Sequence, residues 1–282
     1  MTDMLKLPEP TWFVGCGNMG GAIVEGWRAG GLDLAPLTVI RPSGTAVEGA
    51  RTVTAIPEAG APPQLALLAF KPQKLDEIAP ELRQYLSART VVVSLLAGVE
   101  AASLRQRFPG VGAIVRAMTN LPVAVRRGVT GLYSDDAGDP VRQQIGDLFT
   151  ALGFSMWMAD EARLAALGAV AGAGPAYVAR FIDALAKAGV KRGLTEETAA
   201  ILALETVLGT AWMASATRED MASVARRVAS PKGTTEAGLT VLDRDGALDA
   251  LVAETIEAAA RRGAELASEA KGPSLAESPP LS

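Results

Sequence analysis

The chain has 282 residues, 49% of them apolar, and it carries 27 lysines and arginines against 31 aspartates and glutamates. This length predicts one large or two modest domains, and the slightly negative charge argues against binding to nucleic acid or an anionic membrane. One cysteine and no histidine exclude disulfide scaffolds, cysteine-based metal sites and mechanisms that need an imidazole.

We expect no targeting signal in the N-terminal stretch. Residues 1–10 have no apolar signal core, and no uncharged run in the chain is long enough to span a bilayer. We therefore expect a cytoplasmic protein with no membrane segment.

The first organised stretch is a short apolar strand followed by a glycine turn and a helix. Thr11–Val14 predicts a buried strand and Gly21–Arg28 a helix. Glycines let the backbone turn sharply and approach a ligand closely, and the free amides at a helix N-terminus suit a pyrophosphate. A turn that only joins strand to helix is the alternative. The context favours a dinucleotide site made of Gly15, Cys16, Gly17, Asn18, Met19 and Gly20.

The second predicted strand, Leu37–Ile40, leads directly into Arg41-Pro42-Ser43-Gly44. In a site that prefers NAD, an acidic residue near this position holds the ribose 2′-hydroxyl, and none is present here. Arg41 can instead pair with a 2′-phosphate, and Ser43 can donate to it. NADPH is therefore predicted over NADH, with a solvated loop arginine as the alternative.

Apolar runs and helical patterns alternate as far as residue 158. Leu65–Phe70 predicts a strand covered on both faces, and Lys71 follows it at the carboxyl edge, where ligands bind in open α/β sheets. The other expected elements are a helix over Leu75–Leu86, a strand over Val91–Gly98, a helix over Ser103–Phe108, strands over Gly112–Arg116 and Gly128–Tyr133, a helix over Val141–Leu152 and a strand over Phe154–Met158. This alternation predicts a Rossmann-type, doubly wound parallel sheet.

Beyond Asp160 the sequence shows helical runs broken by glycine. Pro175 is expected to begin one helix and Gly193 to end it. Thr195 is predicted as the N-cap of the next helix, which extends to about Ala216 and is apolar on nearly all sides. We infer dimerisation through these helices, with burial against the first domain as the alternative. The predicted division is 1–159 for a dinucleotide-binding domain, 160–270 for a helical dimerisation and substrate domain, and 271–282 for a disordered tail.

Motifs in both halves, in order and at matching spacing, resemble the pyrroline-5-carboxylate reductases, enzymes of the last step of proline biosynthesis. The resemblance runs from about Trp12 to Leu266. Its motifs are the glycine turn, Phe70-Lys71-Pro72-Gln73, Ala97-Gly98-Val99, Arg116-Ala117-Met118-Thr119-Asn120, Ala171-Gly172-Ala173-Gly174-Pro175-Ala176-Tyr177 and Ser230-Pro231-Lys232-Gly233-Thr234-Thr235.

The resemblance implies a Rossmann domain followed by a helical domain that interlocks with a partner's, giving a homodimer that often assembles further into decamers. It also implies hydride transfer from NADPH, or NADH, to the C=N carbon of a cyclic imine. Thr235 would lie near the substrate nitrogen with Thr234 beside it, while Tyr177 is expected in the core or the interface. The resemblance adds to the cofactor site Ala69, Phe70, Lys71, Pro72, Leu96, Ala97 and Asn120.

The residues themselves support this chemistry. A protonated imine already attracts hydride, so a chain without histidine need chiefly orient two reactants, which can be worth about 7–11 kcal/mol. The amides from Gly233 onward open a predicted helix and suit a substrate carboxylate; capping of that helix by Thr234 or Thr235 is the simpler alternative.

Five positions depart from the family pattern. Serines are usual where Ala171 and Ala173 stand, and glycine is usual at Lys232. Asn or Asp is common at Arg227, and Asn at Ile56. Ile56 bears on the adenosine side of the cofactor, and the other four changes leave open a different cyclic imino acid as substrate. A non-catalytic nucleotide sensor is a further alternative. A lysine-dependent 3-hydroxyacid dehydrogenase is disfavoured, because it needs a catalytic lysine on the helix that enters the second domain and Lys187 and Lys191 lie beyond the glycine-proline stretch instead.

Overall fold

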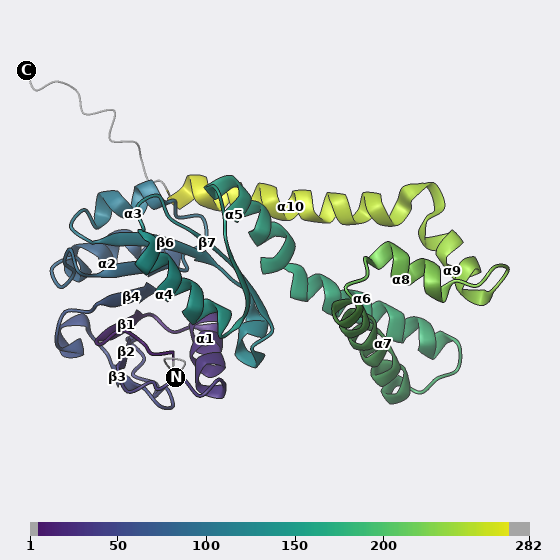
Figure 1. The fold of residues 1–282 in the computed structure, drawn as a ribbon, viewed down its shortest axis with the longest axis horizontal. Coiled ribbons are helices and arrows are strands. Elements are labelled where there is room, and N and C mark those ends of the chain that lie inside the picture. The colour runs from purple at the N-terminus through teal and green to yellow at the C-terminus, as the bar shows by residue number, and fades with distance from the viewer. Residues whose placement is uncertain (1–4, 271–282) are drawn as a thin grey trace, which may run out of the picture. The chain divides into compact units, whose positions relative to one another are not determined.

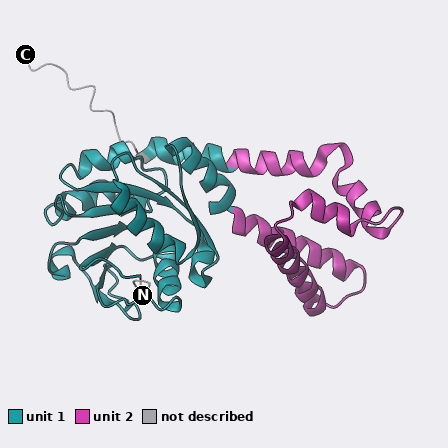
Figure 2. Ribbon diagram, in the orientation of Figure 1, with its two compact units in different colours: residues 1–173, 259–282 teal, residues 174–258 magenta. Residues whose placement is uncertain are grey.

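The computed structural model describes residues 5–270, so the predicted disordered tail at 271–282 lies outside the described residues. Two compact units divide the chain (Figure 2). Unit 1 comprises residues 1–173 and 259–282, and unit 2 comprises residues 174–258. The domain boundary expected between residues 159 and 160 stays a prediction.

Unit 1 is built on an eight-stranded sheet of order β3-β2-β1-β4-β5-β6-β7-β8 (Figure 1). The strands are β1 (Thr11–Val14), β2 (Leu37–Ile40), β3 (Arg51–Val53), β4 (Leu65–Leu68), β5 (Val91–Ser94), β6 (Ala113–Met118), β7 (Gly128–Tyr133) and β8 (Gly153–Trp157). The order reverses at β1, whose neighbours are β2 and β4. The doubly wound α/β class predicted from the sequence is confirmed.

One strand departs from the predicted parallel sheet. β7 pairs with β6 antiparallel, while the other neighbouring pairs are parallel. Residues 119–127 connect β6 to β7 through a short 3₁₀ turn, η3 (Leu121–Val125). A parallel crossover needs a dozen or more residues, so this connection can only reverse the chain.

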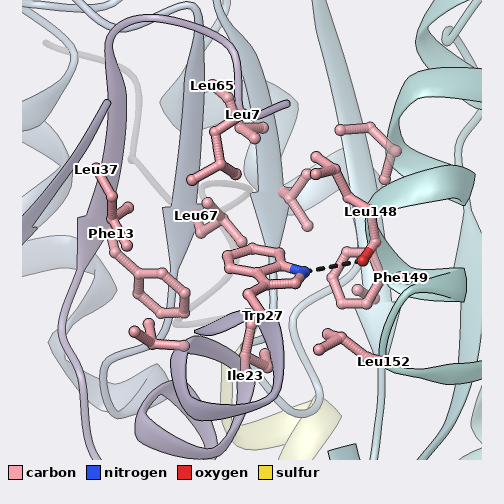
Figure 3. Close-up of a cluster of buried hydrophobic side chains, with 14 of the residues drawn as sticks. Leu7, Phe13, Ile23, Trp27, Leu37, Leu65, Leu67, Leu148, Phe149 and Leu152 are labelled. Carbon is pink, nitrogen blue, oxygen red and sulfur yellow. Dashed lines mark hydrogen bonds between the residues drawn. The ribbon is translucent and has the colours of Figure 1, made fainter. Parts of the chain in front are cut away.

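Helices cover both faces of the sheet because its strands alternate side chains between two clusters. Phe13 packs in one cluster with α1 (Asn18–Ala29) and α4 (Asp139–Thr150). Trp12 and Val14 pack in the other with α2 (Leu75–Leu82) and α3 (Ala101–Arg107). In the first cluster the fully buried Trp27 donates its indole N–H to the Leu148 carbonyl at 2.8 Å (Figure 3).

α2 ends four residues earlier than predicted, and β3 was not predicted.

A further helix, α5 (Glu161–Leu167), packs on β7. The contact is close, because a Cβ placed on Gly131 would lie 2.8 Å from Leu167 and 2.9 Å from Leu164. α5 continues into a π-turn, Gly168–Gly172, whose Ala173 amide donates to the Gly168 carbonyl at 3.3 Å. Such π-turns are frequently found at functional sites.

Unit 2 is helical. Its elements are α6 (Gly174–Lys191), α7 (Glu196–Thr217), α8 (Met221–Val228), α9 (Thr234–Leu242) and the first half of α10 (Ala247–Ala270). Thr195 caps α7 as predicted, accepting from the Thr198 amide at 3.2 Å. α7 buries only three alanines, whereas Ile201, Leu202 and Leu208 are each more than half exposed. A surface of this kind needs a covering partner.

By length and composition alone, two helical stretches would be able to cross a membrane. They are Glu161–Lys191 and Glu196–Thr217. The first passes through α5, which packs on the sheet of unit 1, and the buried core helix of a soluble protein meets the same criteria of length and composition.

The packing of α1 generates a stability prediction. A Cβ on Gly26 would lie 2.1 Å from the Val123 carbonyl oxygen, whereas one on Gly21 in the same helix would meet nothing within 4 Å. Gly26→Ala should lower the free energy of unfolding by about 1–3 kcal/mol or more through overpacking. Gly21→Ala should leave it unchanged or raise it by up to about 1 kcal/mol. Urea unfolding at matched protein concentration measures both, and equal stability of the two variants would contradict this packing.

Candidate active site

The glycine turn lies where the order of the sheet reverses. The Gly15 amide donates to the Ile40 carbonyl of β2, and the Ala69 amide donates to the Val14 carbonyl of β1, both at 2.8 Å. Gly15 has a φ of +80°, and a Cβ there would lie 2.9 Å from the backbone of Ala69 and Phe70. Glycine alone fits both the left-handed conformation and this close approach.

The other two glycines of the turn have different surroundings. A Cβ on Gly17 would meet nothing within 4 Å, whereas one on Gly20 would lie 2.9 Å from the Phe13 ring. Gly15 therefore makes the tight turn, Gly17 leaves open space above the backbone, and Gly20 lets α1 pack against β1. These are the three roles that glycines play in a dinucleotide-binding turn.

The N-terminus of α1 can bind an anion. Gly17 is the N-cap residue without a side-chain cap, and the first turn has no acidic residue. The first hydrogen bond into the turn runs from the Gly21 amide to the Gly17 carbonyl at 2.8 Å. The amides of Asn18, Met19 and Gly20 precede it and have no acceptor within the helix, so the residues present fit a diphosphate.

Arg41 and Ser43 lie in a turn directly after β2. The Gly44 amide donates to the Arg41 carbonyl at 3.0 Å, and the Ser43 and Thr45 hydroxyls lie 3.1 Å apart. Arg41 is close enough to the glycine turn to affect Cys16 electrostatically. Burial raises the pKa of the Cys16 thiol, and the Arg41 guanidinium partly opposes that rise. The turn therefore offers a cation near Cys16 of the glycine turn, with two hydroxyls following it.

The exits of β4 and β5 complete this edge of the sheet. Lys71 is exposed after β4, and Pro72 begins the 3₁₀ turn η2 (Pro72–Lys74). After β5 the Leu95 amide donates to the Leu68 carbonyl at 2.9 Å, which brings Leu96 and the exposed Ala97 to the same edge. The predicted cofactor residues in the loops after β1, β2, β4 and β5 thus lie together at the carboxyl ends of neighbouring parallel strands, where ligands bind.

The side-chain amide of Asn120, a residue predicted to contact the cofactor, makes its hydrogen bonds within the protein. Its side chain is buried, donates through Nδ2 to the Ala171 carbonyl at 2.9 Å and accepts from the Val129 amide at 2.9 Å. It joins the π-turn to β7. Any contact between Asn120 and a cofactor stays a prediction.

The predicted substrate residues lie in unit 2 at the start of α9. Gly233 is the N-cap residue, so neither Thr234 nor Thr235 caps this helix. Lys232 has a φ of +60°, a conformation that costs a residue with a Cβ about 1–2 kcal/mol, and its amide donates to Glu236 at 2.6 Å. The glycine usual at that position would remove this cost.

Arg227 is paired within unit 2. Its guanidinium lies 3.1 Å from the Glu219 carboxylate and 3.0 Å from the Met213 sulfur. It is therefore not an unpaired cation at the start of α9. Of the two cations that depart from the family pattern, Lys232 and Arg227, Arg227 therefore has an acidic partner within unit 2.

The fold, the reversal in strand order and the glycine turn define an NAD(P)-dependent oxidoreductase of the Rossmann class. A family model described as pyrroline-5-carboxylate reductase dimerisation matches residues 161–266, and one described as NADP oxidoreductase, coenzyme F420-dependent, matches residues 12–98. The pyrroline-5-carboxylate reductase of Pseudomonas aeruginosa is 36% identical over 262 residues, covering 90% of this chain and 96% of that protein. The chain belongs to the pyrroline-5-carboxylate reductase family.

Solved structures agree with this assignment. A pyrroline-5-carboxylate reductase from Coxiella burnetii shares 31% identity and a TM-score of 0.83, over 92% of this chain and 99% of that one. The Plasmodium falciparum pyrroline carboxylate reductase with NADP bound has the same fold, with a TM-score of 0.83 at 24% identity over 93% of this chain and 99% of that one. The predicted family, fold class and NAD(P)H cofactor are confirmed.

The open space above Gly17 generates the second prediction. Gly17→Ala should leave the free energy of unfolding within about 1 kcal/mol of wild type, because its methyl group meets nothing in the protein. The same methyl group should lower NADPH affinity at least about tenfold, because it occupies the approach to the α1 amides. Gly110→Ala is the control, since Gly110 is equally open but lies at the opposite edge of the sheet, before β6. Equal NADPH affinities in a fluorescence titration would contradict this site.

Proposed function

We propose that this chain reduces 1-pyrroline-5-carboxylate to L-proline with NADPH, with NADH as the alternative donor, as the last step of proline biosynthesis. The observation that carries the proposal is the glycine turn at the sheet reversal, present in a chain whose near-full-length relatives bear the reductase name. When bound, the cofactor supplies a hydride. The chain itself must bind the cofactor and the imine, orient them toward each other and exclude water from the space between them.

The edge of the sheet is proposed to bind the cofactor in three parts. The amides of residues 18–20 take the diphosphate, and Arg41 with Ser43 takes the 2′-phosphate. The backbone after β4, from Ala69 to Pro72, and the loop after β5, with Leu96 and Ala97, hold the nicotinamide half. The supporting observation is that these segments all follow neighbouring strands that end at one edge.

The start of α9 is proposed to bind the imine. The Gly233 amide already donates to the Ser230 carbonyl at 2.9 Å, so Gly233 shapes the start of α9 and the amides of Thr234 and Thr235 take the substrate carboxylate. The Thr235 hydroxyl contacts the ring nitrogen, with Thr234 beside it. The imine nitrogen is protonated before the hydride arrives, so the neighbouring carbon is electron-poor and no histidine is needed. The hydride then forms the new C–H bond, and the C=N π electrons become the nitrogen lone pair.

The active assembly is proposed to be a cytoplasmic homodimer, joined through the C-terminal helices and able to form decamers, without membrane attachment. The family model for dimerisation covers residues 161–266, which include both stretches apolar enough to cross a membrane. A second copy is the simplest cover for the exposed side chains of α7.

The function is tested by following NADPH oxidation at neutral pH with 1-pyrroline-5-carboxylate, beside imines of other ring size and carboxylate position. Thr235→Ala should lower kcat at least about tenfold, the effect of one hydrogen bond of about 1.5 kcal/mol. Thr240→Ala on the same helix, whose hydroxyl donates to the Glu236 carbonyl, is the control. NADPH binding without oxidation by the five-membered imine would reject the function, and an unchanged rate would remove Thr235 from it.

Cofactor preference is tested at Arg41. Arg41→Ala should weaken NADPH binding about tenfold or more, since a hydrogen bond to a charged group contributes about 1.5–3 kcal/mol, and should change NADH binding less than about twofold. Arg89→Ala is the control, because Arg89 is exposed just before β5 at the opposite edge of the sheet. Equal losses for the two cofactors would show that Arg41 does not contact the 2′-phosphate.

A further inference from the structure

Glu161, the first residue of α5, contacts two other elements with one carboxylate oxygen. Its Oε1 accepts from the Arg116 guanidinium of β6 at 2.6 Å and from the Ala101 amide at 2.9 Å. Ala101 is the first residue of α3, so the carboxylate also lies at the positive end of that helix. Three segments, about 45 and 60 positions apart in the sequence, are joined at this oxygen.

The ion pair alone has a structural explanation. Arg116 is buried, with only 10% of its side chain exposed, and a buried cation requires a partner. The hydrogen bond to Ala101 does not follow from that requirement. It fixes the end of the loop that connects β5 to α3, which contains Leu96 and Ala97.

That loop is held at further points. The Leu96 amide donates to the Ser94 hydroxyl at 3.3 Å, and Gly98, with a φ of +77°, packs against the backbone of α10, where a Cβ would lie 2.8 Å from the Ala267 amide. The π-turn that continues α5 is fixed as well, through the bond from Asn120 to Ala171. Glu161 is the residue that joins these two restrained segments.

We infer that Glu161 is a positioning residue for hydride transfer, because it holds the Leu96–Ala97 loop and the first turn of the dimerisation region in one fixed geometry. The inference rests on the proposed function. Neither the loop nor α5 is predicted to contact the diphosphate or the 2′-phosphate, so loss of Glu161 should affect the nicotinamide end more than overall cofactor affinity.

Two variants separate positioning from stability. Glu161→Gln keeps an oxygen for the Ala101 amide but leaves the buried Arg116 without a charged partner, so its thermal midpoint should fall by about 5 °C or more while kcat stays within about threefold. The double variant Arg116→Leu with Glu161→Leu removes both charges, so its midpoint should return close to wild type. Its kcat should nevertheless fall at least about tenfold, because the loop is no longer held.

Two further measurements complete the test. In the double variant the isotope effect on kcat with nicotinamide-deuterated NADPH should rise, while the NADPH Kd changes less than about threefold. Thr90→Ala is the control: it removes a buried hydroxyl that donates to the Pro63 carbonyl at 2.7 Å before β5, away from α5, and should lower the midpoint without changing kcat. A double variant with wild-type kcat and isotope effect would overturn the inference.

Failure of the proposed function is distinguishable from failure of this inference. A wild-type chain that binds NADPH but reduces no imine rejects the function. The inference is then decided by the nicotinamide fluorescence of bound NADPH, which should differ between wild type and the double variant. Identical spectra would overturn it.

Discussion

The first unit depends on one close approach, where the chain leaves β1 and passes the end of β4. The Gly15 amide donates to β2, the carbonyl of the preceding Val14 accepts from the Ala69 amide, and a carbon added to Gly15 would lie 2.9 Å from the backbone that follows β4. Because the chain must be bare at this point, the helix that follows begins with uncovered amides directly above the sheet edge. The proposed anion site therefore lies where the order of the sheet reverses.

The second unit is governed by a different constraint. α7 carries large apolar side chains around its circumference but buries only alanines within one chain. Its stability must come from contacts that one chain does not supply, which is consistent with the dimerisation model that matches this region. Cofactor binding and assembly therefore belong to different parts of the molecule, and α5 is the segment that packs on the sheet and also begins the matched region.

The sequence predicted most elements because buried parallel strands and glycine turns leave local signals. Apolar runs marked β1, β2, β4 and β5, and Thr195 marked the start of α7. β3 was missed because Arg51–Val53 is short and only partly buried, so its composition resembles a loop. The direction of β7 depends on the length of its connection. Glu161 bonds to Ala101 and Asn120 donates to Ala171, partners 60 and 51 positions away that no local pattern records.

The most direct test of the account is a crystal structure of this chain with NADP⁺ bound. The account predicts diphosphate oxygens within hydrogen-bond distance, about 2.7–3.2 Å, of the amides of residues 18–20, with the nicotinamide beside Ala97 and facing Thr235 of one protomer or its partner. A diphosphate bound away from the glycine turn, or a nicotinamide far from Thr235 in both protomers, would contradict it.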